Sequence, residues 1–180
     1  MVWGSYFMNG RIIQIGRLQY EYSNEIPYEI AKYKNHDYIK IHIPRGKELN
    51  EDVVDESIGN SKNRIKNFYP EIDVSKLLFF TESWLLSNEL DDILDKESNI
   101  IKFKSKFKII KQIENNSDFL NFVFNEREDS IDYNNLQEKT KLQKELKKFF
   151  IRNRRLHIGL GILIDNERIK EIKSNKMFLF

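Results

Sequence analysis

The stretch IKIHIPRGKEL, residues 39–49, contains a strand, the turn that ends it and the approach to a helix. Isoleucines at positions 39, 41 and 43 alternate with Lys40 and His42, which is the period of a strand with one buried face. Pro44-Arg45-Gly46 then ends the strand, because proline and glycine are strong turn formers. We therefore expect a strand over 38–43 that carries His42 near its carboxyl end.

A helix is predicted directly after this turn, over residues 51–68. Asn50 is a good N-cap, and Glu51 and Asp52 fall in the first turn, where the helix dipole favours acids. The apolar stripe that would face the core consists of Val54, Ile58, Ile65 and Phe68. Pro70 closes the segment.

The rest of the chain alternates between strand-like and helix-like segments. Strands are expected at 12–22, 77–82, 107–113 and 156–164, with Gly16 forming a bulge inside the first. Helices are expected at 87–95, about 98–104 and 140–153, while 118–124 fits either a helix or a strand. This order of elements indicates a protein of the α/β (α+β) class.

The composition narrows the possible functions. The chain has 180 residues, and we expect a single domain with a core over 10–165 and a tail over 166–180. A net charge of +2 argues against a dedicated DNA-binding domain, and the absence of cysteine excludes disulfides and thiolate chemistry. No apolar run approaches the ~20 residues of a membrane span. The N-terminus lacks the pattern of a secretory signal, so we expect a cytoplasmic protein.

The chain begins with a cluster of large apolar side chains, Val2, Trp3, Tyr6 and Phe7, with no polar residues before it. Such a cluster is typical either of an edge strand or of a surface that packs against another part of the protein. We therefore expect an N-terminal domain or a second subunit to pack on residues 2–7.

Two titratable side chains are candidates for acid–base chemistry. His42 lies near a strand end, where it could act as a general base, although a strand histidine paired with a neighbour is the more frequent situation. Glu82 follows a buried strand and fits a general base or an ordinary surface carboxylate equally well. Trp84, two residues further on, is either a pocket wall or a core residue. The three histidines lack the spacing of metal ligands, so we expect no metal.

Polar groups elsewhere are candidates for binding. Arg45 and Gly46 lie between a strand and a helix N-terminus, a junction that often binds phosphate, although the acids of the following helix would repel an anion. Arg17, Gln19 and Glu21 share one strand face and either line a polar cleft or face solvent. The basic helix 139–155 would suit a nucleic acid, but a solvated face is favoured because the net charge is small.

Taken together, these blocks resemble a bacterial family of acyltransferase-domain proteins. Members have an N-terminal N-acyltransferase-like domain and a GNAT-like C-terminal domain, and this chain is similar to the latter. The matching stretches follow family order over roughly 11–150: Ile15-Gly16-Arg17-Leu18-Gln19-Tyr20-Glu21, His42-Ile43-Pro44-Arg45-Gly46 with Leu49, Ser83-Trp84-Leu85-Leu86, Ser98-Asn99-Ile100 with Phe103 and Phe107, and Thr140 with Leu142-Gln143. The glycine-rich phosphate loop of the wider superfamily is missing after the 38–43 strand.

The resemblance implies a GNAT-like fold, a mixed and mostly antiparallel sheet flanked by helices. It implies transfer of an acyl group from acetyl-CoA or another acyl-CoA to an amine. Such a reaction needs a base for the amine proton, for which His42 and Glu82 are the candidates, and a phosphate-binding group such as Arg45 with Gly46. Arg17, Glu21 and Trp84 are then candidates for binding the acceptor. The alternative is a ligand-binding or interaction domain that keeps the fold without the chemistry.

Overall fold

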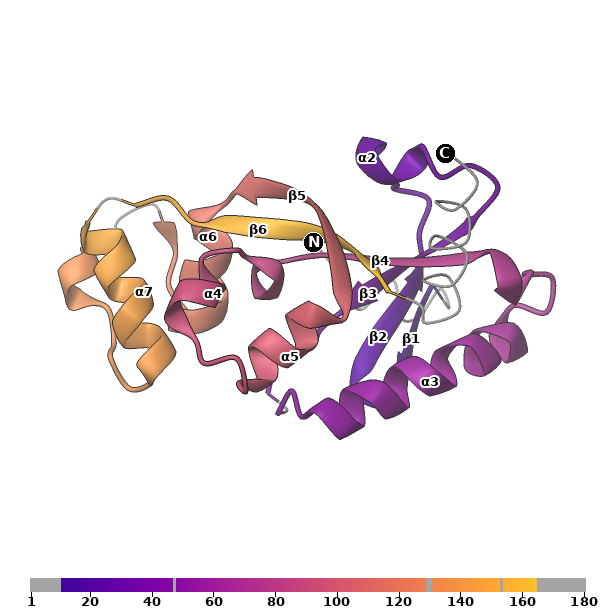
Figure 1. Cartoon of the computed structure of the whole chain (residues 1–180), viewed down its shortest axis with the longest axis horizontal. Coiled ribbons are helices and arrows are strands. Elements are labelled where there is room, and N and C mark those ends of the chain that lie inside the picture. Colours follow the sequence, from indigo (N-terminus) through magenta and orange to yellow (C-terminus); the bar gives the residue numbers. More distant parts are fainter. Residues whose placement is uncertain (1–10, 47, 129–130, 153, 165–180) are drawn as a thin grey trace, which may run out of the picture.

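The computed structural model describes residues 11–46, 48–128, 131–152 and 154–164, which form a six-stranded sheet with helices on both sides (Figure 1). The order across the sheet is β1-β2-β3-β4-β6-β5. All neighbouring strands are antiparallel except β3 and β4, which run parallel. The mixed, mostly antiparallel sheet predicted for the chain is confirmed. The strands are β1 (Ile12–Ile15), β2 (Leu18–Tyr22), β3 (Asp37–His42), β4 (Leu77–Ser83), β5 (Phe107–Glu114) and β6 (His157–Leu163).

The segment 12–22 is a hairpin, so the prediction of one bulged strand was wrong. Ile15 pairs with Leu18, which leaves Gly16 and Arg17 as a two-residue turn between β1 and β2. Gly16 has φ +56°, which glycine adopts without strain at the first position of such turns. The Gln14 side chain donates to the Gly16 carbonyl oxygen at 2.7 Å and closes the turn.

One face of the sheet is covered by α3 (Glu51–Phe68), whose bounds match the prediction. The Asn50 side chain accepts a hydrogen bond from the Asp52 backbone N–H at 2.9 Å and caps the helix as expected. Val54 and Ile65 of α3 are buried against β1 to β4, and Phe103 of α5 (Asn99–Ser105) joins the same cluster. Figure 1 shows α3 running alongside β1 and β2 on this side.

The opposite face carries the short helix α2 (Tyr28–Ala31), which lies in a segment where no helix or strand was predicted. Its Ile30 is fully buried against Leu78 and Phe80 of β4 and Leu160 of β6. A third cluster lies at the far end of the molecule, where α7 packs with α4 and α6 (Figure 1). These helices are α4 (Leu90–Ile93), α6 (Asn116–Phe119) and α7 (Lys141–Ile151).

Short turns of other helix types surround these elements. The predicted helix over 87–95 is shorter than expected and follows the 3-10 turn η2 (Trp84–Leu86). The ambiguous segment 118–124 is helical, and its last part is a single π-helical turn, η3 (Leu120–Phe124), which ends at Asn125 with φ +59°. The 3-10 turns η1 (Val74–Lys76) and η5 (Tyr133–Asn135) complete the structure.

Strand β4 changes its partner halfway along its length. It pairs with β3 from Leu77 to Phe80 and with β6 from Phe80 to Ser83, so the two ladders overlap only at Phe80. The sheet therefore consists of two wings that share β4. We call β1, β2 and β3 the first wing, and β6 and β5 the second wing. Beyond Lys40 the edge of β3 that faces β4 has no strand partner within the described residues.

Candidate functional site

His42 and Glu21 form a direct side-chain pair at the point where the wings separate. His42 ends β3, and Glu21 lies on the neighbouring β2, diagonally across the antiparallel ladder in which Gln19 faces His42. The His42 Nε2 and Glu21 Oε2 atoms are 2.7 Å apart. Both side chains are largely buried, with 17% and 18% of their surface exposed. The register of the ladder therefore brings together two residues that lie 21 positions apart in the sequence.

The surroundings keep His42 neutral at physiological pH. Burial lowers the pKa of His42 below its ordinary value of 6.5, and the hydrogen bond and charge of Glu21 only partly oppose this shift. A carboxylate can only accept, so Nε2 carries the proton in the neutral ring and the lone pair lies on Nδ1. An imidazole oriented in this way is suited to accept a proton from a nucleophile.

Glu82 lies on the other side of the same gap. Lys40 pairs with Phe80 in the parallel ladder, so His42 and Glu82 both follow the last pair by two residues. Glu82 is the exposed position of β4, whose other residues are buried. The structure thus brings His42, Glu21 and Glu82 to one region. Because β2 runs antiparallel to β3, this region gathers the carboxyl ends of β3 and β4 but not that of β2.

Arg45 links the turn after β3 to the π-helical turn η3. Its Nη2 donates to the backbone oxygen of Asn121 at 2.7 Å and to the Asn121 side-chain oxygen at 2.9 Å. The guanidinium also lies over the Phe122 ring, 4.6 Å from its centroid. Gly46, next to it, has φ +89° and is exposed. Sequence reasoning did not suggest Asn121 and Phe122 as neighbours of Arg45, since no local pattern links residues 76 positions apart.

Arg17 and Trp84 have structural contacts of their own. Arg17 is buried in the β1–β2 turn, where its Nε donates to the Glu48 backbone oxygen at 3.0 Å and supports the loop before α3. The sequence suggested that Arg17 shares a strand face with Glu21. In the structure Arg17 lies in the turn before β2 instead. Trp84 packs edge to face with Phe119 at 5.6 Å and contributes to two of the apolar clusters.

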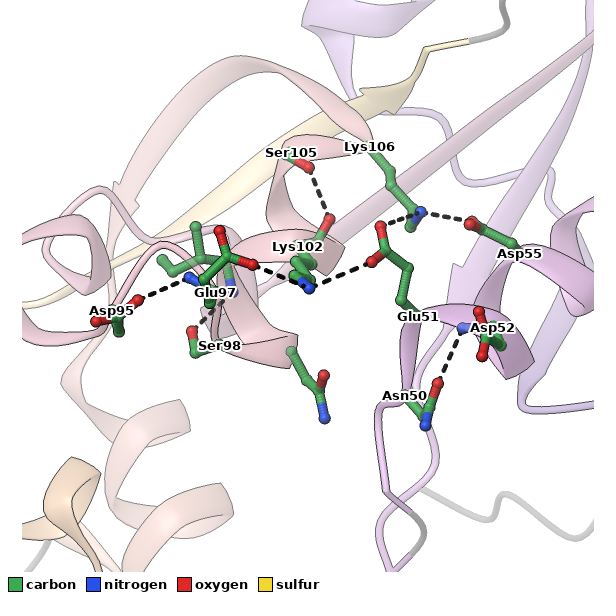
Figure 2. A network of polar contacts seen from close by, with 12 residues as sticks. Asn50, Glu51, Asp52, Asp55, Asp95, Glu97, Ser98, Lys102, Ser105 and Lys106 are labelled. Carbon is green, nitrogen blue, oxygen red and sulfur yellow. Dashed lines mark hydrogen bonds and ion pairs between the residues drawn. The ribbon is translucent and has the colours of Figure 1, made fainter.

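The acids at the start of α3 are partly neutralised by lysines of α5 and its C-cap (Figure 2). Lys106 Nζ lies 2.5 Å from Asp55 Oδ1, and Lys102 Nζ lies 3.5 Å from Glu51 Oε2. Lys106 also approaches Glu51 at 3.6 Å. The sequence indicated an acidic helix end that repels anions. The structure weakens that objection, because two of the acids are paired with cations supplied by α5 and its C-cap.

Other candidate chemistry has a structural explanation or is unsupported. Of the basic residues of α7, Lys147 pairs with Glu138 and Lys148 with Glu145, each at 2.7 Å. Within the described residues, no group of three histidine, cysteine or acidic side chains could hold a metal ion. In the same part of the chain, no helix is long and apolar enough to cross a membrane. The expected packing surface at residues 2–7 and the tail at 166–180 lie outside the described residues.

Two hollows on the surface are lined by residues outside this candidate site. One of about 420 Å³ is formed around Asn125, Asp132 and Leu136, and one of about 390 Å³ lies between the β1–β2 turn and α3 at Gly16, Asn60 and Phe68. Neither is lined by His42 or Glu82. We place the candidate site at the gap between the wings because the paired titratable groups are found there.

The sequence profile described as GNAT-like C-terminal domain matches residues 12–163. The chain therefore belongs to the family of GNAT-like C-terminal domains. No curated protein sequence matches the chain closely enough to count as a relative.

The solved structures to which this chain is similar include acyltransferases. An acyltransferase in complex with decanoyl-CoA superposes with a TM-score of 0.76 at 20% identity, over 89% of this chain and 48% of that one. An acyltransferase in complex with decanoyl-CoA and teicoplanin gives a TM-score of 0.76 at 21% identity, over 89% and 49%. The chain thus spans about half the length of these proteins.

Proposed function

We propose that this chain is the GNAT-like part of an acyl-CoA-dependent N-acyltransferase, with its active site at the gap between β3 and β4. The observation that carries the proposal is the His42–Glu21 pair at the place where the parallel strands separate. The fold family and the acyl-CoA complexes of structurally similar acyltransferases support this choice of reaction. Because those proteins are twice as long, the complete protein is the unit to which we assign the activity.

In the proposed reaction, the amine nitrogen attacks the thioester carbonyl carbon. His42 takes a proton from the nitrogen as the C–N bond forms, and Glu21 holds the ring and stabilises the imidazolium. Backbone groups on the unpaired edge of β3 beyond Lys40 supply hydrogen bonds for the thioester oxygen, which becomes negative in the transition state. The C–S bond then breaks, and the sulfur leaves as the CoA thiol after it takes up a proton.

Arg45 and Gly46 are proposed to contribute to the acyl-CoA site, because they form the turn between β3 and α3. Arg45 closes one side of the gap through Asn121 and Phe122, so its guanidinium is already oriented there. Arg17, which supports the backbone of Glu48, would hold the same loop in place. Trp84, which packs edge to face on the buried Phe119, would form an apolar wall for the acyl group.

The test is a free-thiol release assay with acetyl-CoA, octanoyl-CoA and decanoyl-CoA and a panel of amines. We expect His42→Ala to lower kcat by about 10²- to 10⁴-fold, the usual contribution of a general base, with little change in acyl-CoA affinity. His157→Ala is the matched control, since His157 forms a similar pair with Glu89 at 2.6 Å in a different part of the molecule. Absence of thiol release by the complete wild-type protein with every amine would exclude the proposed function. Equal losses in the two variants would exclude His42 as the base.

A further inference from the structure

The Glu82 carboxylate leaves the sheet on the side of α2. Alternation along a strand places Glu82 on the same face as Leu78 and Phe80. Those two residues pack with Ile30 of α2. Leu77 and Phe79 point to the opposite face, where they join the cluster beneath α3. Glu82 therefore faces away from α3 and from the lysines beside it.

His42 and Glu21 lie on this same side. Residues paired in a ladder point to the same face, so Lys40 and Phe80 share one, and His42 and Glu82 each follow by two residues. Glu21 reaches the same side because its carboxylate bonds to His42. An acceptor bound on this face would meet the proton acceptor and the Glu82 carboxylate together.

Two other carboxylates of this region are paired with basic side chains, whereas the Glu82 carboxylate is not. Glu21 pairs with His42, and Glu29 of α2 pairs with Lys111 at 2.6 Å. Within the part of the chain that the structure describes, the Glu82 side chain takes part in no hydrogen bond or ion pair. The carboxylates of Glu21 and Glu82 and the ammonium group of Lys40 lie on this face around a neutral His42, while Lys108 and Lys111 of β5 lie on the same face further along the ladder. Glu82 is the available carboxylate beside His42, and an exposed carboxylate without a partner is suited to bind a cationic group.

We propose that Glu82 binds the protonated amine of the acceptor, which makes the substrate class a primary alkylammonium compound rather than an alcohol or an uncharged amine. The inference rests on the proposed function above and assigns Glu82 and His42 different roles. Glu82 anchors the ammonium group by a charge-assisted hydrogen bond, while His42 accepts the proton during the reaction.

The protons balance in this scheme. The alkylammonium nitrogen loses one proton to solvent at the exposed Glu82 carboxylate and becomes a nucleophile. It loses a second proton to His42 as the C–N bond forms and the C–S bond breaks. The departing sulfur takes up one proton, so the reaction yields the amide, the CoA thiol and one released proton.

The test compares Glu82→Gln with the wild type in the complete protein, using acceptors of different charge. Ethanolamine, glucosamine and 2-phenylethylamine serve as the charged probes, and hydroxylamine, which is mostly uncharged at slightly alkaline pH, serves as the neutral one. We expect Glu82→Gln to raise KM for the charged amines about 10- to 100-fold, as for loss of a charged hydrogen bond, and to leave their kcat nearly unchanged. KM for hydroxylamine should not change. Glu56→Gln, an exposed position on α3 at the opposite face, is the matched control.

Each contrary result has a separate meaning. A fall in kcat with an unchanged KM would assign Glu82 to proton transfer and overturn the anchoring role. Equal effects on charged and neutral acceptors, or wild-type turnover with hydroxylamine alone, would overturn the inference while the proposed function stands. No thiol release by the wild type with any acceptor would remove the proposed function, and the role of Glu82 with it.

Discussion

At the residue scale, the candidate role of His42 depends on its partner more than on its position. Burial lowers its pKa and Glu21 raises it, so the two influences set the pH at which the ring is neutral. Replacing Glu21 by glutamine removes the charge that stabilises the imidazolium. We expect Glu21→Gln to lower the pKa of His42 further, measured by NMR titration of the imidazole resonances.

The direction in which stability changes with pH follows from the lowered pKa of His42. The unfolded chain binds more protons than the folded one between the lowered pKa of His42 and its ordinary value of 6.5. Stability is therefore lost as the pH falls through that window, and in Glu21→Gln the window should extend to lower pH. Glu89→Gln, which removes the partner of His157, should leave the titration of His42 unchanged. An unchanged or higher pKa of His42 in Glu21→Gln would contradict this account.

The sequence suggested the members of the candidate site but not their arrangement. His42 could be proposed because a polar residue near a strand end is visible in the pattern Ile-Lys-Ile-His. Its pairing with Glu21 depends on the register between β2 and β3, which no local pattern reveals. The contacts of Arg45 with Asn121 join segments far apart in the chain and require the complete fold.

At the scale of elements, β6 carries two glycines because η2 packs directly on it. A Cβ atom at Gly159 would lie 2.5 Å from the Leu86 backbone oxygen, and one at Gly161 would lie 2.7 Å from the Leu86 side chain. The Leu86 oxygen also accepts a hydrogen bond from the Gln112 side chain at 3.0 Å, so the turn is held on both sides. These glycines thus have a packing role inside a strand.

We expect Gly159→Ala to lower the free energy of unfolding by at least about 1–3 kcal/mol, the usual cost of overpacking. The backbone of Leu86 cannot move aside as a flexible side chain would. Gly59→Ala is the matched control, since a Cβ there meets nothing within 4 Å. It should raise stability by about 0.5–1 kcal/mol, because glycine is unfavourable inside a helix. Urea unfolding measures both, and equal effects of the two substitutions would contradict the packing argument.

Elements with strong local signals were predicted well, and those determined by turn geometry were not. Asn50 and Pro70 mark the two ends of that helix in the sequence. Phe68, which was predicted to face the core, is instead exposed. The β1–β2 hairpin was missed because Gly16 inside an alternating run is compatible with a bulge as well as with a two-residue turn. The helix α2 was missed because four residues are too few to show a helical period.

At the scale of the molecule, the two wings are joined by apolar packing and by polar contacts across the gap. Arg45 contacts η3 from one side, and Lys102 and Lys106 reach α3 from the other (Figure 2). An acyl-CoA bound between β3 and β4 would contact both wings. It would therefore bind the folded state alone and stabilise it.

We expect decanoyl-CoA at about 100 times its Kd to stabilise the protein by about 2.7 kcal/mol. For a chain of this size, that free energy raises Tm by roughly 5–10 °C. The measurement is a thermal-shift series with acetyl-CoA, octanoyl-CoA and decanoyl-CoA, with free CoA and decanoic acid as separate controls. If no acyl-CoA changes Tm, the interaction-domain alternative replaces the enzyme.

The strand order also has a consequence for biosynthesis. β6 is the last described strand to leave the ribosome, yet it lies between β4 and the edge strand β5. Until residues 157–163 are synthesised, β4 and β5 have no common neighbour, and the end of β4 lacks its partner. The nascent chain can form the β1–β2–β3 part early, but the sheet becomes continuous only when this strand enters the vacant slot. Folding is thus timed by the arrival of one late segment rather than by steady growth from the N-terminus.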